Sequence, residues 1–151
     1  MTAALSPSCE LCVLLADPVR AGGAIVWRDA ALAVLLVDEP DYPGFCRVVW
    51  HEHVKEMSDL APAERQRIME AVWRVEAAQR AVLAPEKINL ASFGNMTPHV
   101  HWHVIPRYRD DAHFPQPTWA AAQRASDPAR LEARRALLPR LRAAIIERLD
   151  A

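Results

Sequence analysis

Three histidines alternate with apolar residues in the second half of the chain. His99, His101 and His103 are separated by one residue each, and bulky apolar side chains stand between them. Strict alternation predicts a β-strand, in which successive side chains point to opposite faces. The three imidazoles should therefore share one face at intervals of roughly 6.5–7 Å. Because imidazole titrates near neutral pH, such a row suits proton transfer, nucleophilic attack and metal ligation.

Two cysteines near the N-terminus form a second candidate site. Cys9 and Cys12 are separated by two residues, a spacing that lets two thiolates bind one zinc ion. A structural zinc site is tetrahedral, so two further ligands must come from elsewhere in the chain. The alternatives are a redox pair, for which the surrounding βαβ pattern is missing, and a pair of cysteines without function.

Together these features resemble the signature of the histidine triad (HIT) family of nucleotide hydrolases and transferases. The triad stands here as HVHWHVI and is followed by Pro106-Arg107. The resemblance also includes the cysteine pair, the run from Asp38 to His53 and Gly94-Asn95 before the triad, so it covers roughly residues 9–110. Within the family, the chain is similar to the bacterial members that resemble dinucleoside polyphosphate hydrolases.

The resemblance implies a covalent mechanism at the histidines. In the family the middle histidine attacks the α-phosphorus of a nucleotide, which makes His101 the nucleophile and gives a nucleotidyl intermediate that water displaces. His103 would contact the phosphoryl oxygens as charge develops on them, and His99 completes the triad. The implied reaction is hydrolysis at the α-phosphate of a purine nucleotide or dinucleoside polyphosphate, and this chemistry requires no cofactor.

The resemblance also assigns residues that bind the nucleotide and a metal. The sequence has no P-loop, so phosphate binding falls to the Gly94-Asn95 turn, which a phosphate can approach closely because Gly94 has no side chain. Asn89 is implied as a second polar contact to phosphate, and Asp38 matches an acidic residue that holds the ribose hydroxyls. Certain family members complete a structural zinc site with two histidines, and the implied ligands here are Cys9, Cys12, His53 and His99.

The sequence departs from the family pattern at three places. Phe45 replaces the histidine that follows Gly44, and Trp50-His51 stands where the family has Pro-Lys. The loss of that histidine removes a usual orienting partner of the triad, which keeps a nucleotide-binding module without turnover among the alternatives. Met96 stands where the phosphoramidase branch has a serine that assists the leaving amine, so a purine nucleoside phosphoramidase is the less favoured enzyme.

A catalytic metal held directly by the three histidines is a further alternative. Zinc enzymes of other folds use His-x-His pairs as ligands. Three consecutive positions on one strand face, however, span about 13 Å, which is too far for three imidazoles to meet one ion comfortably.

The overall composition is that of a single small enzyme domain. The chain has 151 residues, of which 52% are hydrophobic, and this suffices to bury a core. Its net charge of −1 gives no footprint for nucleic acid or for an anionic membrane surface. The sequence shows neither a signal-peptide pattern nor a long apolar run, so we expect a cytoplasmic protein without disulfides. The family resemblance adds the expectation of a homodimer.

The elements that must position these residues can be predicted from the same sequence. Strands are expected at 24–28, 31–37, 45–50, 87–92 and 100–106, and the first two should pair in an antiparallel manner. A long helix begins near Pro62 and ends before Pro85, and a C-terminal helix begins at Asp127-Pro128 and should be kinked or interrupted at Pro139. We therefore expect an α+β, HIT-like fold with an antiparallel five-stranded sheet. The HIT domain should span 9–110, with residues 111–151 packed on the same domain.

Overall fold

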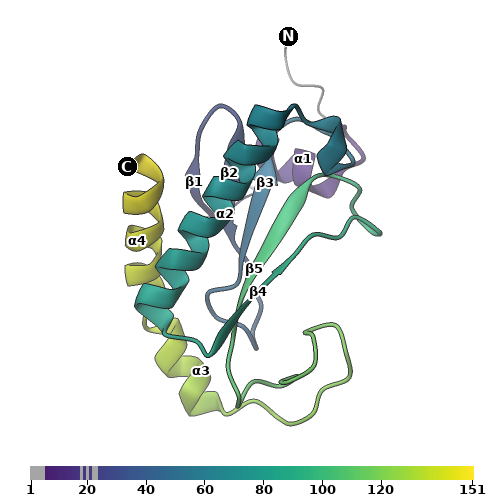
Figure 1. The fold of residues 1–151 in the computed structure, drawn as a ribbon. Coiled ribbons are helices and arrows are strands. Elements are labelled where there is room, and N and C mark those ends of the chain that lie inside the picture. The colour runs from purple at the N-terminus through teal and green to yellow at the C-terminus, as the bar shows by residue number, and fades with distance from the viewer. Residues whose placement is uncertain (1–5, 18, 20, 22–23) are drawn as a thin grey trace.

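Five strands form one antiparallel sheet in the spatial order β1-β2-β3-β5-β4 (Figure 1). The computed structural model describes residues 6–17, 19, 21 and 24–151. The strands are β1 (Ile25–Arg28), β2 (Leu32–Leu36), β3 (Cys46–Trp50), β4 (Lys87–Ala91) and β5 (His101–Arg107). All five predicted strands are present, and the antiparallel α+β fold expected from the sequence is confirmed.

The long helix α2 (Pro62–Leu83) covers one face of the sheet. It begins as predicted, with Pro62 in the first turn and the side chain of Glu64 accepting a hydrogen bond of 2.7 Å from the backbone N–H of Ala61. It ends at Ala84, which has a left-handed backbone with φ of 47°. Its buried positions recur at helical spacing, so one stripe of the helix faces the sheet.

Alternate residues of the strands divide between two apolar clusters. In β2, Leu32 and Val34 belong to the large core beneath α2, whereas Ala33 and Leu35 point to the opposite face. There they pack with Val49 against the short helix α1 (Glu10–Ala16). Towards the other end of this face, Tyr42, Phe45 and Ile105 form a further buried cluster, and His101 and His103 lie between the two clusters.

A buried glutamine attaches α2 to the sheet where β3 begins. The side-chain amide of Gln79 donates hydrogen bonds of 2.8 Å to the carbonyl oxygens of Gly44 and Val104. Gly44 has φ of +92°, and a Cβ at this position would lie 2.5 Å from a methyl group of Leu83. Only glycine fits this junction, because both the backbone conformation and the space exclude a side chain.

Two helices follow the last strand in place of the single helix that was predicted. They are α3 (Pro128–Arg135) and α4 (Leu138–Asp150), and Pro139 lies in the first turn of α4. The predicted interruption at Pro139 is therefore confirmed, because proline is tolerated only where its missing N–H has no helical partner. Helix α4 packs beside α2 and contacts β1 (Figure 1).

Two short elements were not predicted, namely α1 and a 3-10 turn at Met57–Asp59. Across the part of the chain that the structure describes, no helix combines the length and the apolar character needed to cross a membrane.

Candidate active site and metal cluster

Four side chains from distant parts of the chain meet on the α1 side of the sheet. The ligand atoms of Cys9, Cys12, His53 and His99 all lie within 4.8 Å of one another. The Nδ1 atom of His99 lies 3.4 Å from each cysteine Sγ, and the Nδ1 atom of His53 lies 3.3 Å from the Sγ of Cys12. Two ligands at the usual Zn–S and Zn–N distances stand roughly 3.5 Å apart in a tetrahedron. The Cys2His2 set therefore fits a structural zinc ion.

The ring of His99 is oriented for this role by the backbone. Its Nε2 donates a hydrogen bond of 2.6 Å to the carbonyl oxygen of Trp50, which leaves the lone pair of Nδ1 directed at the cysteines. The side chain is fully buried, and burial lowers its pKa below the ordinary value, so the ring is in the neutral form that binds metal. His99 itself lies in a bend just before β5, so it is outside the strand, which begins one residue later than the predicted range 100–106.

In His101, the first residue of β5, it is the other ring nitrogen that is hydrogen-bonded to the backbone. Its Nδ1 lies 2.6 Å from the carbonyl oxygen of His99 and donates to it, so the Nε2 atom carries the lone pair. Burial lowers the pKa of His101, the hydrogen bond to the His99 carbonyl opposes this, and the positive charge of Arg47 lowers it further. A neutral imidazole with one nitrogen tied to the backbone and the other free is the form required of a nucleophile.

His103 follows on the same face and is surrounded by aromatic rings. The ring of Phe45 lies 5.3 Å from it, the ring of Phe93 5.7 Å and the ring of His101 5.1 Å, measured between centroids. Burial lowers the pKa of His103 to about 4, with additional contributions from His101 and Arg47. Its Nε2 is buried without a hydrogen-bond partner among the described residues. Such an atom is a site at which a ligand can supply the missing partner.

His101 and His103 line a cavity of about 690 Å³. Its walls come from α1, from β3 and the residue before it, from the loop 93–97, and from Thr118 and Trp119. Gly94 and Asn95 lie in this loop and thus beside the two histidines, where the sequence required a phosphate-binding turn. The hydroxyl of Ser92 donates a hydrogen bond of 2.8 Å to the carbonyl oxygen of His101 and holds the start of the loop against β5.

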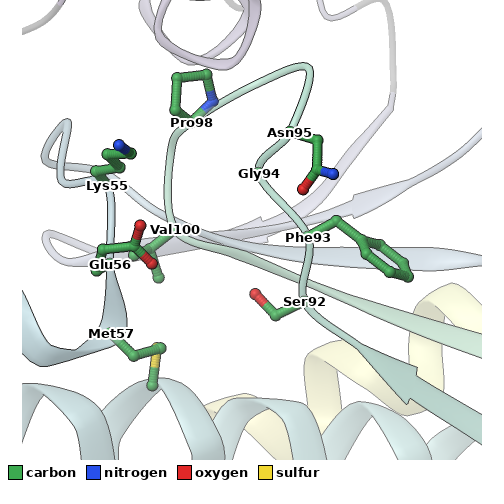
Figure 2. Close-up of a pocket in the computed structure, with 9 residues that line it drawn as sticks. All are labelled: Lys55, Glu56, Met57, Ser92, Phe93, Gly94, Asn95, Pro98 and Val100. Carbon is green, nitrogen blue, oxygen red and sulfur yellow. The ribbon is translucent and has the colours of Figure 1, made fainter.

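A second pocket lies along the same loop and shares part of its lining (Figure 2). Lys55, Glu56 and Met57 stand across this pocket from the loop, and the Phe93 ring and the Asn95 amide turn away from them. Among the residues that line it there is no histidine. Of the two, the cavity lined by His101 and His103 is the one that contains the histidines singled out by the sequence.

Two of the predicted nucleotide contacts lie outside that cavity. Asp38 is exposed just after β2 and is not among the residues that line the space around His101. Asn89, in β4, accepts a hydrogen bond of 2.6 Å from the Nη1 atom of Arg107 and lines a neighbouring pocket together with Trp119. Contact with a nucleotide remains a prediction for both residues.

The network around Arg107 was not foreseen from the sequence. This buried guanidinium pairs with Asp111 at 2.7 Å and also donates to the carbonyl oxygen of Gln116 at 2.7 Å. Burial opposes the charge of Asp111, but donation from Arg107 and from backbone N–H groups outweighs it and holds the pKa of that carboxyl below its usual range. The network fixes the segment that carries Trp119, whose ring lies 4.7 Å from that of Phe93.

The cavity also contains Arg47, which sequence reasoning treated only as part of a strand. It faces the same side as the histidines because it lies directly opposite His103 in the β3–β5 pairing. The available signal was its charge in an otherwise apolar strand, at a position that would be buried if both faces of the sheet were covered.

The chain was also compared with known proteins. The sequence model of the HIT domain matches residues 21–110, more than half of the chain. The chain belongs to the HIT family. An AP-4-A phosphorylase from Mycobacterium tuberculosis is 29% identical over 98 residues, which are 61% of this chain and 50% of that protein. An asymmetrical bis(5'-nucleosyl)-tetraphosphatase from Schizosaccharomyces pombe is 27% identical over 95 residues, 60% of this chain and 52% of that protein.

This HIT protein spans about half the length of the curated relatives it matches. Its fold extends further along a solved structure. A zinc-bound histidine triad family protein from Mycobacterium smegmatis aligns with 95% of this chain and 96% of its own, with a TM-score of 0.63 and 24% identity. The HIT-like fold predicted from the sequence is confirmed by this match.

Proposed function

We propose that this HIT protein is a nucleotide hydrolase that cleaves at the α-phosphate of a purine nucleotide or dinucleoside polyphosphate through a covalent intermediate on His101. The observation that carries the proposal is the hydrogen bond from Nδ1 of His101 to the His99 carbonyl, which leaves Nε2 as a neutral nucleophile in the cavity. The names of the two curated relatives support a substrate of this class.

In the proposed first step, the Nε2 lone pair of His101 attacks the α-phosphorus, and the bond to the leaving phosphate oxygen breaks with its electron pair. The imidazole becomes positively charged, and the His99 carbonyl stabilises that charge through the Nδ1 proton. Water then attacks phosphorus, the P–N bond breaks, and the nucleoside monophosphate leaves while a proton passes to solvent. Splitting one displacement into two easier steps is the gain from covalent catalysis.

The oxygens of the reacting phosphate need hydrogen-bond donors. His103 lies next to His101, and its Nε2 has no partner among the residues that the structure describes; the backbone and amide of Gly94-Asn95 line the same cavity. Donors fixed in a partly dry cavity stabilise developing charge without reorganising. We assign these residues to the phosphate and retain Asp38 and Asn89 as candidate contacts to the rest of the nucleotide.

We further propose that Cys9, Cys12, His53 and His99 hold one structural zinc ion. The tetrahedral spacing of their ligand atoms supports this, and so does the zinc bound in the Mycobacterium smegmatis relative. Zinc here would supply a fixed point for the N-terminal segment and for the residue that precedes β5. His99 in turn supplies the carbonyl that orients His101.

A product assay tests the proposed reaction. We expect diadenosine tetraphosphate to yield AMP and ATP, and adenosine phosphoramidate to be the poorer substrate, because Met96 rather than a serine stands at the cavity and is 97% exposed. Chromatography of the products separates the alternatives. ADP formed only with added phosphate would indicate phosphorolysis, faster release of AMP from the phosphoramidate would indicate a phosphoramidase, and binding without product would indicate a module without turnover.

The second copy of the chain is the other proposed partner. An antiparallel sheet with strands at both edges leaves backbone groups to cover, and a two-fold interface is a common solution. Sedimentation at micromolar concentration should give twice 16.9 kDa, and a single 16.9 kDa species would contradict the dimer.

A further inference from the structure

Arg47 is placed in the catalytic cavity by the pairing of three strands. In β3 it stands opposite Leu35 of β2 on one side and His103 of β5 on the other. Side chains of paired residues lie on the same face of a sheet, so the guanidinium and the imidazole of His103 share the open face. Arg47, His101 and His103 all line the same cavity.

The guanidinium of Arg47 has no anionic partner in the described part of the chain. Its Nε is buried without a hydrogen bond, and none of its nitrogens forms an ion pair there. Among the described residues that line the cavity, Glu10 of α1 is the one carboxylate, and it forms no ion pair with Arg47. The guanidinium of Arg47 instead lies over the ring of Phe45, with its carbon 5.8 Å from the ring centroid. A cation in such a place leaves donors available for a ligand.

The sheet order sets Arg47 across His103 from the phosphate-binding loop. Strand β5 lies between β3, which carries Arg47, and β4, which leads into Gly94-Asn95. Neighbouring strands are about 4.8 Å apart, so the donors approach the cavity from both sides of the histidine strand. This arrangement suits a chain of phosphates that crosses β5 better than a single phosphate.

We propose that Arg47 binds a phosphate of the substrate beyond the α-phosphate and thereby selects phosphoanhydride over phosphoramidate substrates. The inference rests on the proposed function, since it takes His101 as the point of attack. Arginine presents a planar fork of donors that matches phosphate oxygens, and the apolar wall at Phe45 limits the water that would screen the interaction. Its charge on the leaving side would also stabilise the departing phosphate oxygen.

Binding of adenosine, AMP and ADP tests this role without turnover. The measurements use the full chain with His101→Ala as background, so that no ligand is hydrolysed during calorimetry. We expect Arg47→Met in this background to weaken ADP about 10- to 100-fold, to weaken AMP less and to leave adenosine unchanged. Arg47→Lys should restore part of the ADP affinity, because it keeps the charge without the fork. Arg80→Met, an exposed arginine on the opposite face in α2, is the matched control and should change nothing.

Equal weakening of all three ligands by Arg47→Met would overturn the proposal, because it would indicate a structural role through Phe45. Unchanged ADP affinity would overturn it as well. A melting temperature for Arg47→Lys close to that of the background separates these results from misfolding. The proposed hydrolase activity can be refuted independently. It would be wrong if wild-type protein released no AMP from diadenosine tetraphosphate while Arg47→Met still weakened ADP more than AMP and AMP more than adenosine.

Discussion

Two histidines, two residues apart, belong to regions with opposite character. In the cysteine cluster, Nε2 of His99 donates a hydrogen bond to the backbone carbonyl of Trp50, so Nδ1 carries the lone pair that can bind a metal. In the cavity, Nδ1 of His101 donates a hydrogen bond to the carbonyl of His99, so Nε2 carries the lone pair. Whether a histidine binds a metal through Nδ1 or can attack through Nε2 therefore depends on which ring nitrogen is hydrogen-bonded to the main chain.

The regions also differ in how far their polar groups are satisfied. His99 and the two cysteines are buried and lie in contact with one another, so the cluster is closed around its ligand atoms. In the cavity, Nε2 of His103 and Nε of Arg47 have no partner among the described residues. Buried polar groups are normally hydrogen-bonded, so the closed region suits a structural role and the unsatisfied one suits a transient ligand.

The largest effect should come from removing the imidazole of the cavity. His101→Ala should lower turnover at least about 10⁴-fold, since the covalent step is lost, and leave AMP affinity within about tenfold. Its zinc content should match that of wild type, because His101 is not a member of the cluster. Product release, calorimetry and elemental analysis measure the three quantities. Loss of zinc together with activity would contradict the separation of the two sites and would favour a catalytic metal bound by His101.

A smaller effect on activity, and a large one on stability, should come from the cluster. Cys12→Ser should lose the bound zinc, lower the melting temperature and reduce turnover partially through displacement of His99. Cys46→Ala is the matched control, because Cys46 is equally buried but lies in the core beneath α2. It should keep its zinc. A wild-type protein that carries no zinc when prepared without chelators would refute the site.

The smallest effect should be a difference in acid sensitivity. His103 has a pKa of about 4 in the folded protein, against an ordinary value of 6.5, so the unfolded chain binds more protons between these values. The contribution of His103 to stability is present above pH 6.5 and is lost as pH falls toward 4. His103→Gln should therefore show a weaker decline in melting temperature over this range than wild type. Parallel profiles would mean that the ring is more solvated than its aromatic surroundings suggest.

Much of this arrangement is predictable because it depends on local patterns. Alternating apolar residues specify the strands, Pro62 marks the start of α2, and Pro139 marks the interruption between α3 and α4. The cluster was predictable through the family resemblance, which supplied His53 and His99 as partners for the cysteines. Helix α1 was missed because it has only seven residues and no side-chain cap, so its order depends on packing against the sheet.

The residues in and beside the cavity that were missed depend on pairing between distant segments. Arg47 enters the cavity through its pairing with His103, 56 residues later in the sequence, which no local pattern contains. The bond between Asn89 and Arg107 likewise follows from the pairing of β4 with β5. Sequence periodicity gives the face of a residue within one strand, but the neighbours on that face are set by register.

Strand β5 is fixed at both of its ends. The cluster holds His99 just before the strand, and the buried pair of Arg107 with Asp111 holds its last residue. Between these points the strand is hydrogen-bonded to β3 on one side and β4 on the other. Its amide protons should thus exchange with deuterated water only when the whole sheet opens, so that local fluctuations leave His101 and His103 in place.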